Sequence, residues 1–502
     1  MSRSRPLISL TVFLVAALAV GPAIARPTAP AQAPGSTGIA PAERFDPGVI
    51  RSDFAALYEG LRGGAYDLYV HTPEPELDRL YEQTLTGFDR PLSVDEIRTR
   101  FQLFSAAARL GHVRVEVPGG DYDAFREAGG KAFPLILRIV NGRSYVGQDL
   151  SGLPGIAPGD EIVSLDGVPM AEWLVRTGRH VSTDNDYMAH SLLEFQFPQL
   201  LWLERGEVDR FELVVRKADG RDHPVTVPAR TRAEVMAASE AQPETLDLDG
   251  SSRSADMLGD GVAYLRPGPS YNVEPEGNPW DPTAFHTFVD EAFTRFIADG
   301  ATDVLIDLRV NPGGDNSFSD LMVAWFADRP FRFASDFRIR VSPQSIASNA
   351  ARLASQPPGA DGASSRLAAL YETVQPGDIV HFGFPESTPR DGPRFEGRVW
   401  VLVNRQTYSN AVSTAALIQD YGFGTILGEP TADLATSFGA MEQFTLPATG
   451  IVVGYPKAHI IRPSGDEEAR GVTPDILIET PVIQPVSDPV LQQALSAIRA
   501  RQ

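Results

Sequence analysis

Apolar residues follow a helical spacing through the first part of the chain. Between Glu43 and about Leu110, residues such as Phe54, Leu57 and Tyr58 fall on one face of a helix, and the same spacing returns further along. This pattern predicts an N-terminal helical domain over 43–118.

A second helix start and a strand are expected inside this domain. Ser93 and Glu96 have the spacing of a capping box, in which each side chain accepts a hydrogen bond from the other residue's backbone N–H. The helix that begins there is expected to stop near Gly111, and the residues from His112 to Val117 then alternate between polar and apolar, as an edge strand does. His112 is therefore expected at the junction of a helix and a strand.

Residues 133–230 carry a pattern that is mainly typical of β structure, with short apolar runs between Gly, Pro and Asp turns, and they are expected to form most of a PDZ-like β domain over 119–235. Within them, the segment 155–167 places a Pro-Gly-Asp turn before a strand that ends in another glycine turn. This segment resembles the signature of PDZ domains, which bind a peptide strand along the edge of a sheet. An ordinary β-hairpin has the same pattern, and this string alone does not decide between the two.

Strands and helices alternate from 236 to 480. The expected strands are Gly261 to Leu265, Val304 to Leu308, Val399 to Val403 and Thr425 to Leu427, and the expected helices are Thr283 to Ala298, Asn316 to Phe326 and Ser409 to Tyr421. Such alternation predicts a crossover α/β layer, in which ligands bind at the carboxyl ends of the strands. Residues 332–394 are expected to be an insertion or lid, and 481–502 a C-terminal helix or tail. The fold class is therefore α/β, within a multidomain α+β chain.

Composition narrows the possible functions. The chain has 502 residues and a formal net charge of -21, which argues against nucleic acid as a partner because a phosphate-binding face needs clustered basic residues. The absence of cysteine excludes disulfides, thiolate metal sites and a cysteine nucleophile. No metal-binding string such as His-Glu-x-x-His occurs, so neither a metal nor a cofactor is expected.

The first 25 residues have the pattern of a secretory signal peptide. Arg3 and Arg5 are followed by an uncharged stretch from Leu7 to Val20 and by a small-x-small cleavage site at Ala23 to Ala25. Export to the periplasm or the medium is the prediction, and an uncleaved anchor is the alternative. Residues 26–42 are expected to be a flexible linker, and no later stretch reaches the ~20 apolar residues of a membrane helix.

Two turns at predicted strand ends are candidates for chemistry. In the first, Gly313 and Gly314 follow Asn-Pro, and such a glycine pair can turn backbone N–H groups toward a developing oxyanion. In the second, Ser409 lies between a strand and a helix, where a nucleophile can be exposed. Taken singly, the glycine pair could be a plain turn and Ser409 an N-cap that bonds the first helical amides.

The combination of motifs resembles peptidase family S41. Both turns occur in the family's order, Gly-Glu-Pro-Thr follows at 428–431 and Gly-Val-Thr-Pro-Asp at 471–475, while the segment from Leu110 to Arg114 looks like the family's Gly-His-Thr segment. The resemblance covers most of the chain except 332–394. It implies an S41-type core over 236–480 and a serine endopeptidase that acts on polypeptides.

The resemblance also implies roles for single residues. Ser409 matches the nucleophile, and backbone N–H groups of Gly313 or Gly314, together with that of Asn410, match the oxyanion donors. The base of the Ser-Lys branch has no counterpart, because no lysine occurs between 428 and 445 and Lys457 lies in a later turn.

The sequence looks instead like the Ser-His-Glu branch. That branch implies His112 as the base and Glu468 as the acid that orients it, with the neighbouring Glu467 as the alternative acid. A non-catalytic binding protein on the same scaffold, or an esterase or amidase for small molecules, are the alternatives to a peptidase.

Overall fold

The computed structural model describes residues 44–115, 119–242, 246, 248–274, 277–354, 362–483 and 485–501. The predicted signal peptide and the linker up to Ala42 lie outside these residues. None of the described helices is both long and apolar enough to cross a lipid bilayer.

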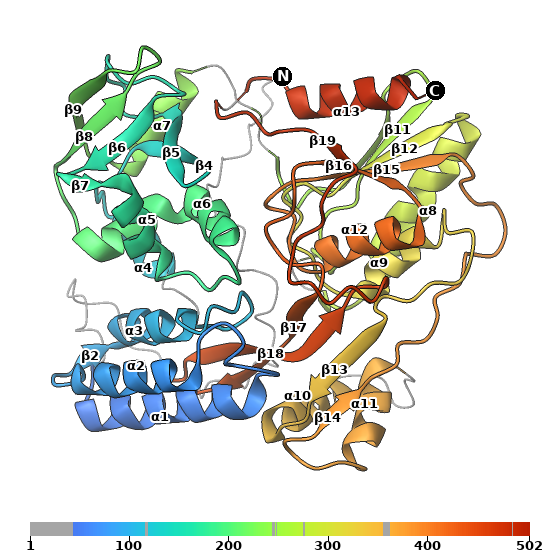
Figure 1. The fold of residues 1–502 in the computed structure, drawn as a ribbon, viewed down its shortest axis with the longest axis horizontal. Coiled ribbons are helices and arrows are strands. Elements are labelled where there is room, and N and C mark those ends of the chain that lie inside the picture. Colours follow the sequence, from blue (N-terminus) through green and yellow to red (C-terminus); the bar gives the residue numbers. More distant parts are fainter. Residues whose placement is uncertain are drawn as a thin grey trace, which may run out of the picture.

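The N-terminal segment folds as three helices, in blue in Figure 1, with three two-residue strands. Its elements are β1 (Arg44–Phe45), α1 (Pro47–Gly64), α2 (Glu74–Thr86), β2 (Leu92–Ser93), α3 (Val94–Ala106) and β3 (Arg114–Val115). The expected capping box is confirmed, because Glu96 N donates to Ser93 Oγ and Ser93 N donates to Glu96 Oε2. His112 lies between α3 and β3, as its place in the sequence predicts.

The next segment is an antiparallel sheet with helices, at the upper left of Figure 1. Its strands are β4 (Leu135–Val140), β5 (Arg143–Asp149), β6 (Glu161–Leu165), β7 (Val168–Pro169), β8 (Arg210–Arg216) and β9 (Asp222–Pro228), and its helices are α4 (Gly119–Glu127), α5 (Met170–Gly178), α6 (Asp186–Arg205) and α7 (Arg232–Glu240). The sequence pattern missed α6, whose Pro198 lies inside the helix and breaks the expected signal. Its apolar face, including Leu193, Phe197 and Leu200, packs into the core of this segment.

The main sheet is the crossover α/β layer that the alternating pattern predicts. Its strand order is β10-β11-β12-β15-β16-β19, with β10 (Ser254–Met257), β11 (Val262–Arg266), β12 (Asp303–Asp307), β15 (Arg398–Val403), β16 (Thr425–Gly428) and β19 (Ile476–Leu477). From β11 to β19 each pair of neighbours is parallel, so the carboxyl ends of β12, β15 and β16 meet at one edge.

Helices cover both faces of this sheet. One apolar core joins α8 (Thr283–Ala298), α9 (Asn316–Val323) and α12 (Asn410–Tyr421) to the sheet, and a second joins α13 (Pro489–Arg499) to its other face. In Figure 1, α13 lies along the top of the sheet and α12 and α9 lie below it. Burial on both faces explains why β12 and β15 are nearly continuous apolar runs.

A third sheet connects the main sheet to the N-terminal helices. Its order is β14-β13-β18-β17, with β13 (Asp336–Arg340), β14 (Ile379–His381), β17 (Ser437–Thr445) and β18 (Val452–Ile461), and the segment also carries α10 (Pro343–Ala354) and α11 (Ala363–Tyr371). The short strand β3 pairs with β18, and the β17–β18 ribbon shares a core with α1 and α3. Part of the expected insertion thus belongs to a sheet, and this sheet brings His112 toward the core of the chain.

Candidate active site

The two predicted turns lie against each other at the edge of the main sheet. Tyr408 N donates to Asn311 O (3.0 Å), and Val310 N donates to Asn404 Oδ1 (3.1 Å). Thr407 Oγ1 adds a bond to Leu308 O (2.9 Å). The turn after β12 and the turn after β15 are therefore fixed to each other by hydrogen bonds.

Ser409 lies directly before α12 but does not cap this helix with its side chain. Its φ is 52° and its ψ is -124°, and its side chain makes no capping bond to α12. A non-glycine residue in this region costs on the order of 1–3 kcal/mol, so surrounding contacts must hold it there. Within the described part of the chain, Ser409 Oγ has no hydrogen-bond partner, which leaves it free to react.

Gly313 lies directly beside the serine. A Cβ at Gly313 would lie 2.7 Å from Asn410 N and 2.8 Å from Ser409 Cβ, and its φ of +85° also favours glycine. The space next to the Ser409–Asn410 peptide is therefore kept open by the absence of a side chain.

The three predicted oxyanion donors differ in whether their backbone N–H is already hydrogen-bonded. Gly313 N already donates to Asn311 Oδ1 (2.9 Å), so this N–H is engaged inside the turn. No described residue accepts a hydrogen bond from Gly314 N or Asn410 N, and Asn410 N belongs to the first turn of α12, where N–H groups lack helical partners. Of the predicted donors, Gly314 and Asn410 are the two with available N–H groups.

His112 lies next to the turn that carries Ser409. Its ring stacks on that of Tyr408 with centroids 5.4 Å apart, and the Tyr408 hydroxyl donates to Gly111 O (3.3 Å). His112 is only 4% exposed, and its buried Nδ1 has no hydrogen-bond partner among the described residues. No hydrogen bond joins His112 to Ser409 in this part of the chain.

Burial and the nearby Arg114 lower the pKa of His112 to about 4, and a hydrogen bond with the backbone of Phe438 only partly opposes them. The ring is therefore neutral at pH 7 and able to accept a proton. A general base needs this state before it takes the proton of a hydroxyl.

The predicted orienting acid lies at the surface. Glu468 has a side chain that is 67% exposed and pairs with Arg470 (3.2 Å), while Glu467 pairs with Arg338 (2.8 Å). In the described ranges, neither carboxylate contacts His112. The loop of Glu468 contacts the segment just before β17, since Ala435 N, three residues before Phe438, donates to Arg470 O (2.9 Å).

Lys457 is engaged elsewhere and is not a base for Ser409 in this arrangement. It is buried, and its Nζ donates to Glu442 Oε1 (2.5 Å). Asp307, at the end of β12, accepts a hydrogen bond from Arg309 N (3.0 Å).

Sequence reasoning missed two buried aspartates at this site. Burial raises the pKa of Asp433 to about 6, and this residue accepts the backbone N–H of Ser409 (2.5 Å). Burial, and to a lesser degree Asp433, raises the pKa of Asp184 to about 7, and this residue accepts the N–H of Gly111 (3.1 Å). Asp433 follows the end of β16, and this position is a signal that could have drawn attention to it; Asp184 gives no such signal.

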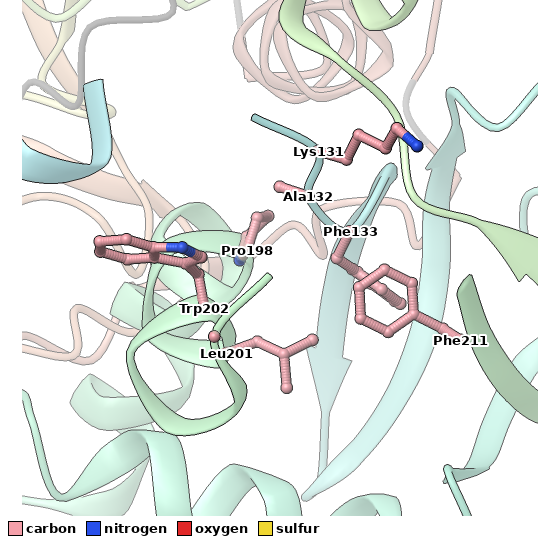
Figure 2. Close-up of a pocket in the computed structure, with 8 residues that line it drawn as sticks. Lys131, Ala132, Phe133, Pro198, Leu201, Trp202 and Phe211 are labelled. Atoms are coloured by element: carbon pink, nitrogen blue, oxygen red, sulfur yellow. The ribbon is translucent and has the colours of Figure 1, made fainter. Parts of the chain in front are cut away.

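A small pocket lies elsewhere, in the antiparallel segment (Figure 2). Its lining comes from the segment before β4, from α6 and the residue after it, and from β8, and comprises Lys131, Ala132, Phe133, Pro198, Leu201, Trp202, Gly206 and Phe211. None of these described lining residues is a predicted site residue. Within the described residues, no group of three or more His, Asp or Glu side chains is placed to hold a metal ion.

Comparisons with known proteins concern the family and the fold. Residues 283–478 match the model of peptidase family S41. The chain resembles the structure of mature CPAF complexed with lactacystin, with a TM-score of 0.58 and 17% identity over 90% of this chain and 97% of that one. A CPAF s499a mutant gives 0.56 and 16% identity over 86% and 93%.

The photosystem II D1 C-terminal processing protease gives a TM-score of 0.43 and 16% identity over 89% of this chain and 97% of that one. No curated protein sequence matches the chain. At these identities the two CPAF structures establish a shared fold, while the family model identifies an S41 domain in this chain.

Proposed function

Given that residues 283–478 form a domain of the S41 family of serine-type peptidases, we propose that the protein is an exported endopeptidase in which Ser409 is the nucleophile and His112 the base. The observation that carries this proposal is Ser409 itself. Its backbone has a positive φ, its hydroxyl makes no capping bond to α12, and it lies against Gly313. These are the features of a strained nucleophile turn, and a serine that only caps a helix needs none of them.

The residues divide the reaction between them. Ser409 Oγ attacks the scissile carbonyl while His112 takes its proton, and the N–H groups of Gly314 and Asn410 stabilise the oxyanion of the tetrahedral intermediate. His112 then gives the proton to the leaving amine, and water hydrolyses the acyl-enzyme with His112 again as base. Because Ser409 and His112 are not bonded to each other here, substrate binding must bring the two side chains into contact.

Glu468 remains our proposal for the acid that orients His112. It must release Arg470 and turn inward, and the loop that carries it already packs beside the strand that contacts His112. The unpartnered Nδ1 of His112 is an atom that such a carboxylate could bind.

Substrate class and location complete the proposal. A polypeptide substrate follows from the S41 domain, and the antiparallel segment is proposed to be PDZ-like and to bind a peptide strand. Export follows from the signal-peptide pattern of residues 1–25.

The test is hydrolysis of fluorescently labelled, denatured casein by the wild type and by Ser409→Ala. The variant should lose at least about a thousandfold in kcat/KM, because the nucleophile and base act as a unit. Ser413→Ala, one helical turn along α12, is the matched control and should keep full activity and the same melting temperature. Undiminished turnover by Ser409→Ala contradicts the assignment, and hydrolysis of p-nitrophenyl acetate without casein cleavage favours an esterase instead.

A further inference from the structure

Two buried aspartates each accept a backbone N–H from a turn that carries a proposed reacting side chain. Asp433 Oδ2 accepts from Ser409 N (2.5 Å), and Asp184 Oδ2 accepts from Gly111 N (3.1 Å), directly before His112. Asp433 is 2% exposed and Asp184 is 7% exposed, so water does not compete for these bonds.

The loops that carry the two aspartates touch each other. Asn185 Nδ2, next to Asp184, donates to Ala432 O (3.0 Å), next to Asp433. The Tyr187 hydroxyl adds a bond to Pro430 O (3.3 Å). The turn of His112 and the turn of Ser409 are therefore linked through one continuous contact between the start of α6 and the loop after β16.

Both turns need such support. Ser409 holds a left-handed backbone conformation that an L-residue avoids. Gly111 lies so close to Asp184 that a Cβ on Gly111 would be 2.5 Å from Asp184 Oδ2. A buried carboxylate is a strong acceptor for a backbone N–H, so each aspartate can fix its turn.

We propose that Asp184 and Asp433 are positioning residues that hold His112 and Ser409, respectively, in the places from which they react. This inference rests on the proposed function of Ser409 and His112. Neither aspartate touches the substrate; each acts through the turn that it holds.

The two carboxylates differ in how many of their oxygens are used, and the difference makes the proposal testable. Asp433 uses both oxygens for backbone N–H groups, because Oδ1 accepts from Leu434 N (2.8 Å). Asp184 uses one, since its buried Oδ1 has no hydrogen-bond partner among the described residues and lies 3.9 Å from His71 Nε2. Asparagine has one acceptor oxygen, so it can replace Asp184 but cannot satisfy both N–H groups at Asp433.

The experiment measures the second-order rate constant with which a fluorophosphonate labels Ser409 in the full chain, together with kcat, KM and the melting temperature. Asp433→Asn and Asp433→Ala should both label about tenfold more slowly or worse, with KM little changed. Asp184→Ala should lose a similar factor, and Asp184→Asn should restore most of that rate.

Asp53→Asn is the matched structural control. Asp53 is 1% exposed, and its two oxygens accept from Ala448 N (3.2 Å) and Thr449 N (2.7 Å) far along the chain. This variant should lose stability as Asp433→Asn does but keep the wild-type labelling rate.

Three results would be decisive. Wild-type labelling of Asp433→Asn, or failure of Asp184→Asn to improve on Asp184→Ala, overturns the positioning roles. Equal slowing in Asp53→Asn also overturns them, because the effect is then general destabilisation. Absence of any Ser409 adduct in the wild type is a different result, since it contradicts the proposed function itself.

Discussion

Two buried charged clusters in this molecule are built in opposite ways. Between β17, β18 and α10, Glu442 is paired with both Lys457 (2.5 Å) and Arg352 (2.6 Å). At the edge of the main sheet, Asp184 and Asp433 accept backbone N–H groups, and buried atoms of Asp184 and His112 have no hydrogen-bond partner among the described residues.

The pKa values follow this difference. Burial raises the pKa of Glu442, but Lys457 and Arg352 outweigh burial and hold it at about 2. Burial raises the pKa of Asp433 to about 6 and of Asp184 to about 7, while hydrogen bonds from backbone N–H groups only partly oppose it. In the cluster of Glu442, Lys457 and Arg352, here called the matched cluster, the carboxylate is paired with cations, so removing it is costly. In the second cluster, carboxylates with raised pKa values lie beside the residues that we propose to react.

The largest expected effect comes from breaking the matched cluster. Glu442→Gln removes the carboxylate that pairs with the buried Lys457 and with the partly exposed Arg352, and it should lower the free energy of unfolding by about 3–5 kcal/mol. Urea denaturation measures this loss. Glu59→Gln, in an exposed pair with Arg62, is the control and should change stability little.

Gly313→Ala should disturb the site at the edge of the main sheet, where Asp433 and Ser409 lie, without removing a charge. The added Cβ meets Tyr408 O at 2.6 Å as well as Ser409 and Asn410, so the turn that carries Ser409 must shift. The rate of fluorophosphonate labelling should fall about a hundredfold. Gly377→Ala, at φ +102° with open space around it, repeats the backbone strain away from the site and should leave labelling unchanged.

The matched cluster should also respond to pH with a defined sign. The pKa of Glu442 is lower in the folded chain than the ordinary value of 4.5, so its stabilisation is present above that value and is lost as the pH falls toward 2. The stability gap between wild type and Glu442→Gln should narrow by about 2 kcal/mol between about pH 5 and pH 3. A gap that stays constant over this range contradicts the pairing.

The smallest effect separates the two candidate acids. Glu468→Gln should slow labelling of Ser409 about tenfold if this carboxylate turns toward His112, since an orienting acid stabilises the imidazolium. Glu467→Gln should leave the rate unchanged, because its exposed pair with Arg338 has no part in the proposed reaction. Slowing by Glu467→Gln alone reverses the assignment.

Local patterns predicted the parts of the molecule that depend on neighbouring residues. The capping box of Ser93, the parallel strands and the two turns at 310–316 and 404–410 follow from spacing and turn chemistry, and each lies where it was expected. Ser409 could be singled out because a strand end and a helix start meet at one residue.

Contacts between residues that are far apart in the sequence could not be predicted from the local pattern of residues. The β17–β18 ribbon was missed, yet it carries the contacts that bring His112 to the core through β3. Asp184 reaches Gly111 from the loop just before α6, 73 positions further along the chain, and no spacing along the chain encodes that meeting. Helix α6 was hidden by its internal Pro198, whose cost is offset by the apolar face that it buries.

The most direct test of the central claim is peptide mapping by mass spectrometry after reaction of the folded wild type with a fluorophosphonate. The account predicts one covalent adduct, on Ser409, and loss of that adduct when His112 is replaced by Ala. An adduct on another residue, or casein cleavage that continues after complete modification of Ser409, would contradict it.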